Sequence, residues 1–188
     1  MITISSGFIG NFKLGDNIVH NLAILRELYV YQATGSEEQC ELLRKPIVLL
    51  IASVTEAVLF DLYLRISQFT REGVANIPDE ILDEIRNKTI DEFAKYIDNA
   101  RSKSLLGTDT ALYDALHELR KLRNRVHIQN TKSHFEDHES KAFNAARQLC
   151  AEQTLEKVMQ FMENKYSRKM QKHVEDFVLP WDSHITST

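Results

Sequence analysis

An apolar segment from Ile47 to Phe69 constrains the fold of this 188-residue chain more than any other feature. Drawn as a helix, the segment has apolar residues on all sides, which indicates a central helix packed against several neighbours. Its most apolar part, Ile47 to Phe60, is shorter than the roughly 20 residues that a membrane span needs, and it contains Glu56. The segment therefore predicts the buried helix of a bundle and no membrane span.

Glu56 is the one acidic residue in this apolar part. A buried carboxylate is costly without a partner, so we expect a cation from another helix beside it. An arginine between residues 120 and 125 is the candidate, in a pair that serves either the structure or a reaction.

Capping residues and apolar periodicity divide most of the chain into helices. Asp16 is a plausible N-cap for a first helix that ends near Thr34 and Gly35. Residues 36–39 resemble a capping box for a second helix, which either kinks at Pro46 or gives way there to a new helix. Further helices are expected at 79–100, after an N-cap at Thr108 or Asp109, and from Glu139, with helix continuing from Lys165 to Trp181.

These elements predict an all-α fold, an antiparallel bundle of four to six helices with a short irregular or β-like N-terminal arm. We expect residues 1–15 to form that arm, as an extended segment or a short hairpin. Residues 16–181 would form a single helical domain, and residues 182–188 a flexible tail. Trp181, the chain's single tryptophan, is expected either to dock on its own fold or to cover a partner.

The segment from His117 to His127 gathers cations beside an apolar stripe. Because helical residues turn by about 100° each, Leu112, Ala115, Leu119, Leu122 and Val126 share one face. One flank of that face carries Arg120, Arg123, Asn124 and His127. The far side, where charged residues normally meet water, carries Asp114, Glu118, Lys121 and Arg125.

Arg123 is informative because a guanidinium stays charged and is costly to desolvate without an anion. One interpretation is a structural ion pair with another helix. The other follows from its neighbours, since a guanidinium that binds phosphate beside an imidazole suits phosphodiester cleavage without a metal.

The segment resembles the motif of the HEPN superfamily of small all-α proteins, an arginine followed by four to six residues and then histidine. Arg120 and His127 are separated by six residues, and Arg123-Asn124 is similar to the family's arginine–polar pair. Only three residues separate Arg123 from His127, which leaves open which arginine has the motif role. The resemblance extends from about Pro46 onward.

The resemblance implies a metal-independent endoribonuclease, of a family that includes toxins and defence effectors. His127 would act as general base or acid, Arg120 or Arg123 would stabilise charge on the phosphoryl oxygens, and Asn124 would orient the phosphate or His127. It also implies a homodimer and a nucleotidyltransferase-like antitoxin as partner. The alternatives are a non-catalytic HEPN-like module that binds a nucleotide, RNA or protein, and a purely structural helical protein.

Composition limits the remaining possibilities. The formal net charge of −4 argues against a broadly basic nucleic-acid surface, so we expect local contact with RNA and none with DNA. Two cysteines are too few for a disulfide scaffold, which favours the cytoplasm. We expect no cofactor and no metal, because His134, Glu136, Asp137 and His138 lie in a polar loop where such residues are usually solvated.

Overall fold

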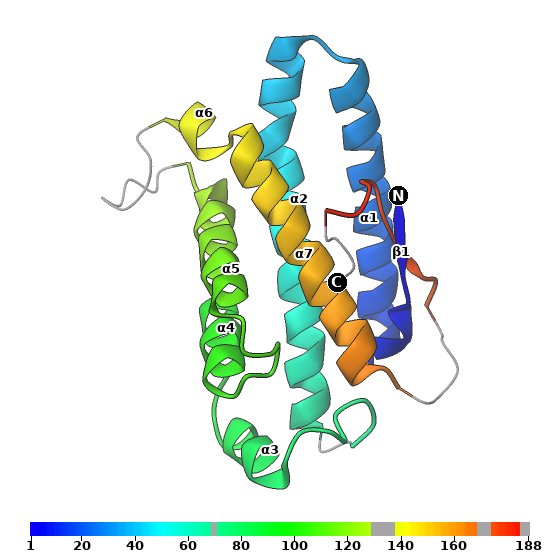
Figure 1. Ribbon diagram of the computed structural model, residues 1–188, viewed down its shortest axis with the longest axis vertical. Coiled ribbons are helices and arrows are strands. Elements are labelled where there is room, and N and C mark those ends of the chain that lie inside the picture. The colour runs from blue at the N-terminus through cyan, green and yellow to red at the C-terminus, as the bar shows by residue number, and fades with distance from the viewer. Residues whose placement is uncertain (69–70, 129–137, 169–173, 185–188) are drawn as a thin grey trace.

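The computed structural model describes residues 1–68, 71–128, 138–168 and 174–184. Within these residues the chain is mostly helical, with seven α-helices and one two-stranded sheet, so the all-α prediction is confirmed (Figure 1). The helices are α1 (Phe12–Thr34), α2 (Glu37–Ser67), α3 (Asp79–Arg86), α4 (Phe93–Ser102), α5 (Thr110–Arg123), α6 (Glu139–Ala142) and α7 (Ala145–Tyr166), and the strands are β1 (Ile2–Ile4) and β2 (Phe177–Leu179).

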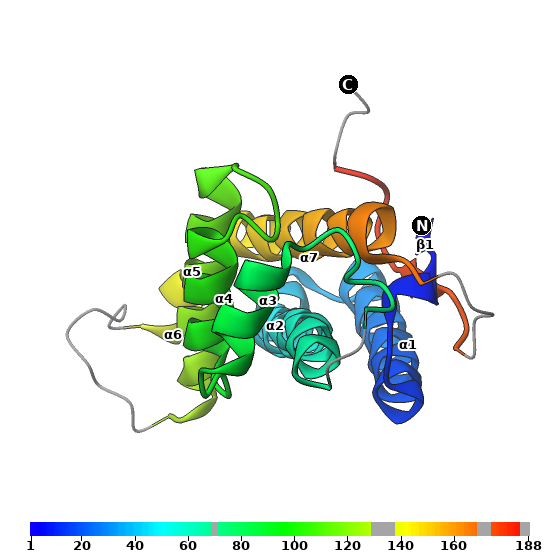
Figure 2. The same ribbon diagram turned by 90° about the horizontal axis from the view of Figure 1, so that it is seen from below.

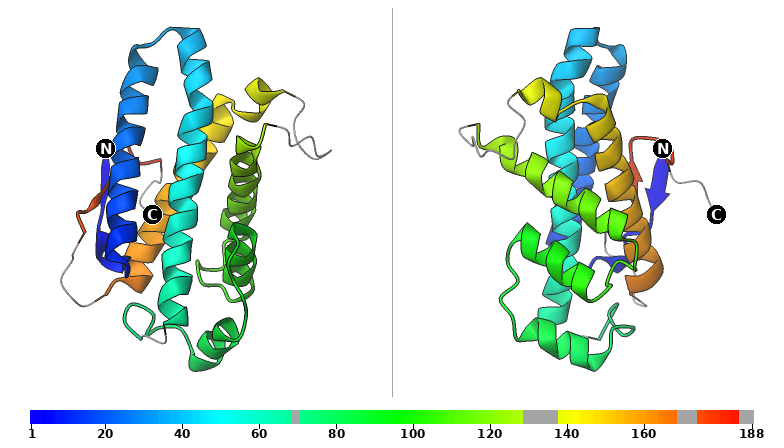
Figure 3. Two further views of the ribbon diagram at one scale, coloured as in Figure 1. Left: turned by 180° about the vertical axis from the view of Figure 1, so that it is seen from behind. Right: turned by 60° about the vertical axis from the view of Figure 1, so that its left-hand side comes forward.

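Helix α2 is the central element, as its apolar sequence predicts. It packs against α1 on one side, α5 and α4 on the other, and α7 across its front (Figures 1 and 2). By length and composition alone α2 qualifies as a membrane span, but 61% of its most apolar 18-residue window is buried inside the fold. The side of α2 that faces away from α7 is not covered by another described helix (Figure 3).

The two ends of the α1–α2 hairpin follow the sequence signals. Gly35 caps the C-terminus of α1, and Ser36 and Gln39 form the predicted capping box of α2. Helix α2 runs through Pro46 without restarting, which settles the two alternatives in favour of one helix. Proline removes the N–H that would bond the carbonyl of Leu42, so the helix tolerates the loss of one backbone hydrogen bond at this position.

Two helices expected to be continuous are broken, so the described residues form seven helices where four to six were predicted. The segment 79–100 stops at Arg86, with Asn87 as its C-cap, and restarts at Phe93. The helix expected from Glu139 stops at Ala142, and the Asn144 side chain caps α7 by accepting a hydrogen bond from the Arg147 N–H at 2.9 Å. Asparagine competes with helical hydrogen bonding and so favours such ends.

Segments near the two ends of the sequence pair in the small sheet. Strand β1 pairs antiparallel with β2, with Ile2 opposite Leu179 and Ile4 opposite Phe177. Helix therefore does not continue to Trp181, because α7 ends at Tyr166 and Phe177–Leu179 pairs as a strand. The arm does not form its own hairpin, and α1 starts at Phe12, four residues before Asp16, with Asn11 as N-cap.

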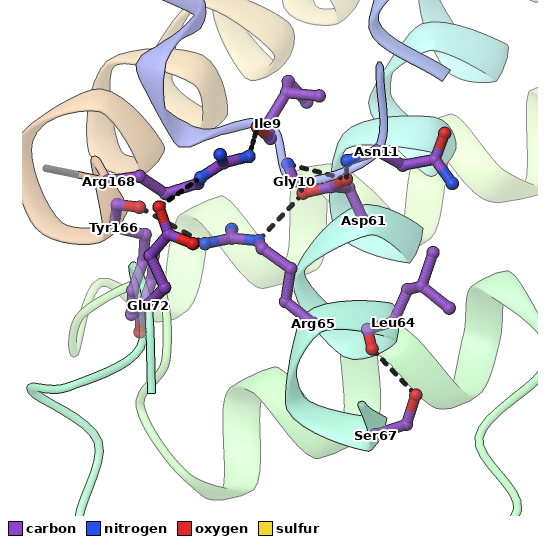
Figure 4. Close-up of polar contacts among 10 residues, drawn as sticks. All are labelled: Ile9, Gly10, Asn11, Asp61, Leu64, Arg65, Ser67, Glu72, Tyr166 and Arg168. Carbon is purple, nitrogen blue, oxygen red and sulfur yellow. Dashed lines mark hydrogen bonds and ion pairs between the residues drawn. The ribbon is translucent and has the colours of Figure 1, made fainter. Parts of the chain in front are cut away.

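A buried polar cluster fastens the arm to the bundle (Figure 4). The Asp61 carboxylate, fully buried, accepts hydrogen bonds from the backbone N–H groups of Gly10 and Asn11 at 3.0 Å and from Arg65 Nε at 2.9 Å. Arg65 Nη1 donates to the Tyr166 carbonyl at the end of α7 at 3.3 Å. Burial lowers the pKa of the Arg65 guanidinium, and the charge of Asp61 opposes that shift.

The C-terminal segment also packs onto the fold. Trp181 is 6% exposed, and its ring centroid lies 5.7 Å from that of Tyr29 in α1, so it docks on its own chain. Ser183 Oγ donates to buried Glu156 at 2.5 Å, and a ring nitrogen of His184 lies 2.8 Å from Glu152. Ser183 and His184, expected to belong to a flexible tail, thus make defined contacts with α7.

Candidate phosphate-binding site at the end of α5

The first part of the cationic segment, up to Arg123, lies on helix α5 as the sequence predicts. Asp109 is the N-cap, and its carboxylate accepts a hydrogen bond from the Ala111 N–H at 3.0 Å. The buried face consists of Leu112, Tyr113, Leu116, Leu119 and Leu122. The α-helix ends at Arg123 and a 3-10 turn follows over Asn124–Val126, so Val126 leaves the predicted apolar stripe and is 54% exposed.

Arg123 forms an ion pair with Glu56 across the α2–α5 contact. Arg123 Nη2 lies 2.8 Å from Glu56 Oε2, and the two side chains are 40% and 22% exposed. Arg123 Nη1 also donates to the side chain of Asn124 at 3.5 Å. The expectation that an arginine of this segment pairs with Glu56 is confirmed, and the pair lies at the surface.

Arg120 lies one turn before Arg123 on the same flank of α5, because residues three apart on a helix are neighbours. Its side chain is half-buried, and its Nε is buried with no hydrogen-bond partner among the described residues. A buried N–H without an acceptor costs about 1–3 kcal/mol, and more when the group is charged. An anionic oxygen bound at this position would remove that cost.

Arg125 was expected on the water-facing side, and this prediction is wrong. Arg125 is 8% exposed, and its Nε donates to the Glu139 carboxylate of α6 at 3.1 Å. The 3-10 turn after α5 winds more tightly than an α-helix, which turns residue 125 away from the predicted direction. Glu139 also pairs with Lys45 of α2, so this carboxylate connects α2, α6 and the 3-10 turn. Helical periodicity does not predict these contacts.

His127 is accessible but does not share the helical surface of the arginines. It follows the 3-10 turn in an extended conformation, with φ −83° and ψ 93°, and its side chain is exposed. Its backbone N–H donates to the Asn124 carbonyl at 3.4 Å, which keeps it close to the end of α5. Within the described part of the chain its ring has no hydrogen bond or ion pair.

The structure therefore brings Arg120, Arg123 and Asn124 together on the α5 flank beside Glu56, with His127 just beyond them. Of the four loop residues considered as metal ligands, His134, Glu136 and Asp137 lie outside the described residues, and His138 is exposed. Among the residues that are described, no three histidine, cysteine or acidic side chains are placed to hold a metal ion.

The comparisons with known proteins do not assign the chain to a family. No protein-family model matches the sequence, and neither a curated protein nor a solved structure matches it.

Proposed function

We propose that this protein is a metal-independent endoribonuclease of HEPN type, with its active site where α5 ends beside α2. The observation that carries the proposal is the buried Nε–H of Arg120, which has no acceptor among the described residues and lies one turn from Arg123. Two guanidinium groups on one flank can bind neighbouring oxygens of a phosphodiester.

In the proposed reaction, His127 removes the proton from a ribose 2′-hydroxyl. The 2′-oxygen then bonds to phosphorus as the bond from phosphorus to the 5′-oxygen breaks, which gives a 2′,3′-cyclic phosphate and a 5′-hydroxyl. Arg120 and Arg123 stabilise the charge on the phosphoryl oxygens, and Asn124 orients the phosphate or the imidazole. The leaving 5′-oxygen takes its proton from an acid on the opposite side.

The same proposal includes a cytoplasmic homodimer. In-line cleavage benefits from both a base and an acid, and a twofold axis would supply the second His127. A nucleotidyltransferase-like antitoxin is the partner that the family resemblance implies.

A non-catalytic RNA- or nucleotide-binding module is the second candidate. It is favoured by the His127 ring, which lacks an orienting hydrogen bond within the described residues, whereas catalytic histidines are usually oriented by a second group. Such a module would use the arginines to hold phosphate without cleaving it.

Digestion of RNA in the presence of a chelator separates the two candidates. We expect the wild-type protein to produce 2′,3′-cyclic phosphate ends, and His127→Ala and Arg120→Ala to lose this activity while remaining folded. His20→Ala and Arg26→Ala, at exposed positions on α1, are the matched controls and should cleave normally. RNA binding without cleavage at high protein concentration would favour the module, and cleavage that survives His127→Ala would contradict the proposed chemistry.

A further inference from the structure

Phe60 is an exposed aromatic ring on a rigid support. It lies on α2 and is 41% exposed, although α2 is the central helix of the fold. Its ring meets that of Tyr96 edge-on at 6.3 Å, and Tyr96 stacks on Tyr63 at 5.2 Å. The Tyr63 hydroxyl donates to the Tyr96 carbonyl at 2.8 Å, and both tyrosines are 4% exposed. The support is therefore fixed by packing and by a hydrogen bond.

This ring lies beside the candidate phosphate site. Phe60 follows Glu56 by four residues, so the two side chains are neighbours on α2, on the order of 6 Å apart. Glu56 in turn lies 2.8 Å from Arg123. The pKa of the Tyr96 hydroxyl is raised, first by burial and next by the charge of Glu56, which agrees with the close approach of the aromatic and charged groups.

The surroundings of the ring leave it open to a ligand. Phe60 is 41% exposed, so other described residues leave part of its ring uncovered. One turn of helix separates the ring from the Glu56–Arg123 pair, and this separation is comparable to the distance between the phosphate and the base of one nucleotide. An exposed aromatic ring beside guanidinium groups is the combination by which proteins bind unpaired nucleotides.

We propose that Phe60 is a stacking platform for an unpaired nucleobase next to the phosphate that Arg120 and Arg123 bind. The inference rests on the proposed function and narrows its substrate to single-stranded RNA. In a duplex each base is already stacked between its neighbours and is unavailable to the ring. Stacking is tolerant of sequence because every base has a π-face, so the platform selects unpaired RNA and not a particular base.

The first test measures binding of a short, unstructured 2′-O-methyl RNA, which cannot be cleaved, by fluorescence anisotropy. Phe60→Ala and Phe60→Leu should weaken binding by roughly 5- to 100-fold, whereas Phe60→Trp should preserve it because it keeps a stacking surface. Phe12→Ala is the matched control, since Phe12 is 58% exposed on α1, and it should leave the affinity unchanged. Circular dichroism establishes that each variant is folded.

The second test uses the same 2′-O-methyl backbone without bases. The wild-type protein should bind this oligomer more weakly than the complete RNA. The loss of affinity should be about as large as the loss that Phe60→Ala causes with the complete RNA. Phe60→Ala should bind the two oligomers equally, since the ring and the base act as one interaction. An equal preference for the complete RNA in both proteins would overturn the platform.

The outcomes also separate this inference from the function on which it rests. If Arg123→Ala abolishes RNA binding and Phe60→Ala does not change it, the phosphate site stands and the platform is refuted. If the wild-type protein does not bind RNA, or if Arg120→Ala and Arg123→Ala bind RNA normally, the phosphate site and the platform are both refuted. If Phe60→Ala only dissociates a dimer in sedimentation experiments, without changing RNA affinity, the ring is covered by a second copy and the platform is again refuted.

Discussion

The Glu56 carboxylate lies 2.8 Å from the Arg123 guanidinium, and this contact joins the central helix to the helix that carries the candidate site. Both side chains remain partly exposed, so the pair is open to exchange with a soluble anion. In the proposed function the Glu56 carboxylate is paired with the Arg123 guanidinium in the absence of RNA, and an RNA phosphate must displace that carboxylate.

Glu56→Gln should therefore bind RNA severalfold more tightly than the wild-type protein, because the competing anion is gone. The loss of stability should stay below about 1 kcal/mol, since the pair is partly solvated. Anisotropy titrations and urea unfolding measure the two effects. Glu118→Gln, which removes a pair with Lys121 elsewhere on α5, is the control and should leave affinity unchanged. Weaker RNA binding in Glu56→Gln would show instead that Glu56 positions Arg123.

Asp61→Ala should reduce the free energy of unfolding by about 3–5 kcal/mol, because it leaves the Arg65 guanidinium buried without its carboxylate. It also removes the acceptor for the backbone N–H groups of Gly10 and Asn11. Asp83→Ala breaks a pair in which the aspartate side chain is 68% exposed, and it should change stability by no more than about 0.5 kcal/mol. Similar urea midpoints for the two variants would contradict the structural role of Asp61.

Trp181 should emit at a shorter wavelength in the folded protein than in urea, because its indole is buried against Tyr29. Trp181→Ala should cost about 3 kcal/mol of stability, measured by circular dichroism, since it leaves a cavity where a large aromatic ring packed. The adjacent Asp182→Ala, which alters a side chain that is 98% exposed, serves as the control. An emission spectrum unchanged by urea would mean that the C-terminal segment does not dock.

Glu139 should make the stability of the protein depend on pH. Partial burial alone would raise the pKa of this carboxyl, but hydrogen bonds from Lys45 and Arg125 outweigh it, and the pKa lies below its ordinary value of 4.5. A carboxyl whose pKa is lower in the folded state stabilises the fold above its unfolded pKa, and this contribution is lost as the pH falls.

The difference in unfolding free energy between wild type and Glu139→Gln should accordingly be largest near neutral pH and shrink below about pH 4.5. Urea unfolding across this range measures it. Glu80→Gln, an exposed position on α3, should show no such trend. A difference that stays constant as the pH falls would contradict the ion-pair role of Glu139.

Local signals in the sequence predicted much of the fold. The capping box at Ser36 and Gln39, the stop at Gly35 and an N-cap at Thr108 or Asp109 could be identified from sequence spacing, because they depend on contacts within a few residues. Of the two N-cap candidates, the structure has Asp109. The strand at Phe177–Leu179 could not be predicted in this way, because its hydrogen-bond partner is β1 at the opposite end of the chain. Strand formation depends on packing against a neighbouring strand as well as on the preference of the residues themselves.

In the candidate site, too, some features were predicted from the sequence and others were not. Helical periodicity placed Arg120 and Arg123 on one flank of α5, and the need to pair a carboxylate within an apolar segment connected Glu56 with this segment. Periodicity failed for Arg125 and His127, because an α-helix was assumed past Arg123 and the chain instead enters a 3-10 turn. No local signal links Arg125 with Glu139, since that contact depends on how α6 returns to the bundle.

The pairing of β1 with β2 also bears on how the protein folds during its synthesis. The first strand leaves the ribosome long before the second, so Ile2 and Ile4 have no strand partner while the helices are being made. Contacts between such distant segments form late, and until they form the unpaired edge is open to association with other chains. Folding of the nascent polypeptide therefore cannot finish before β2 has been translated.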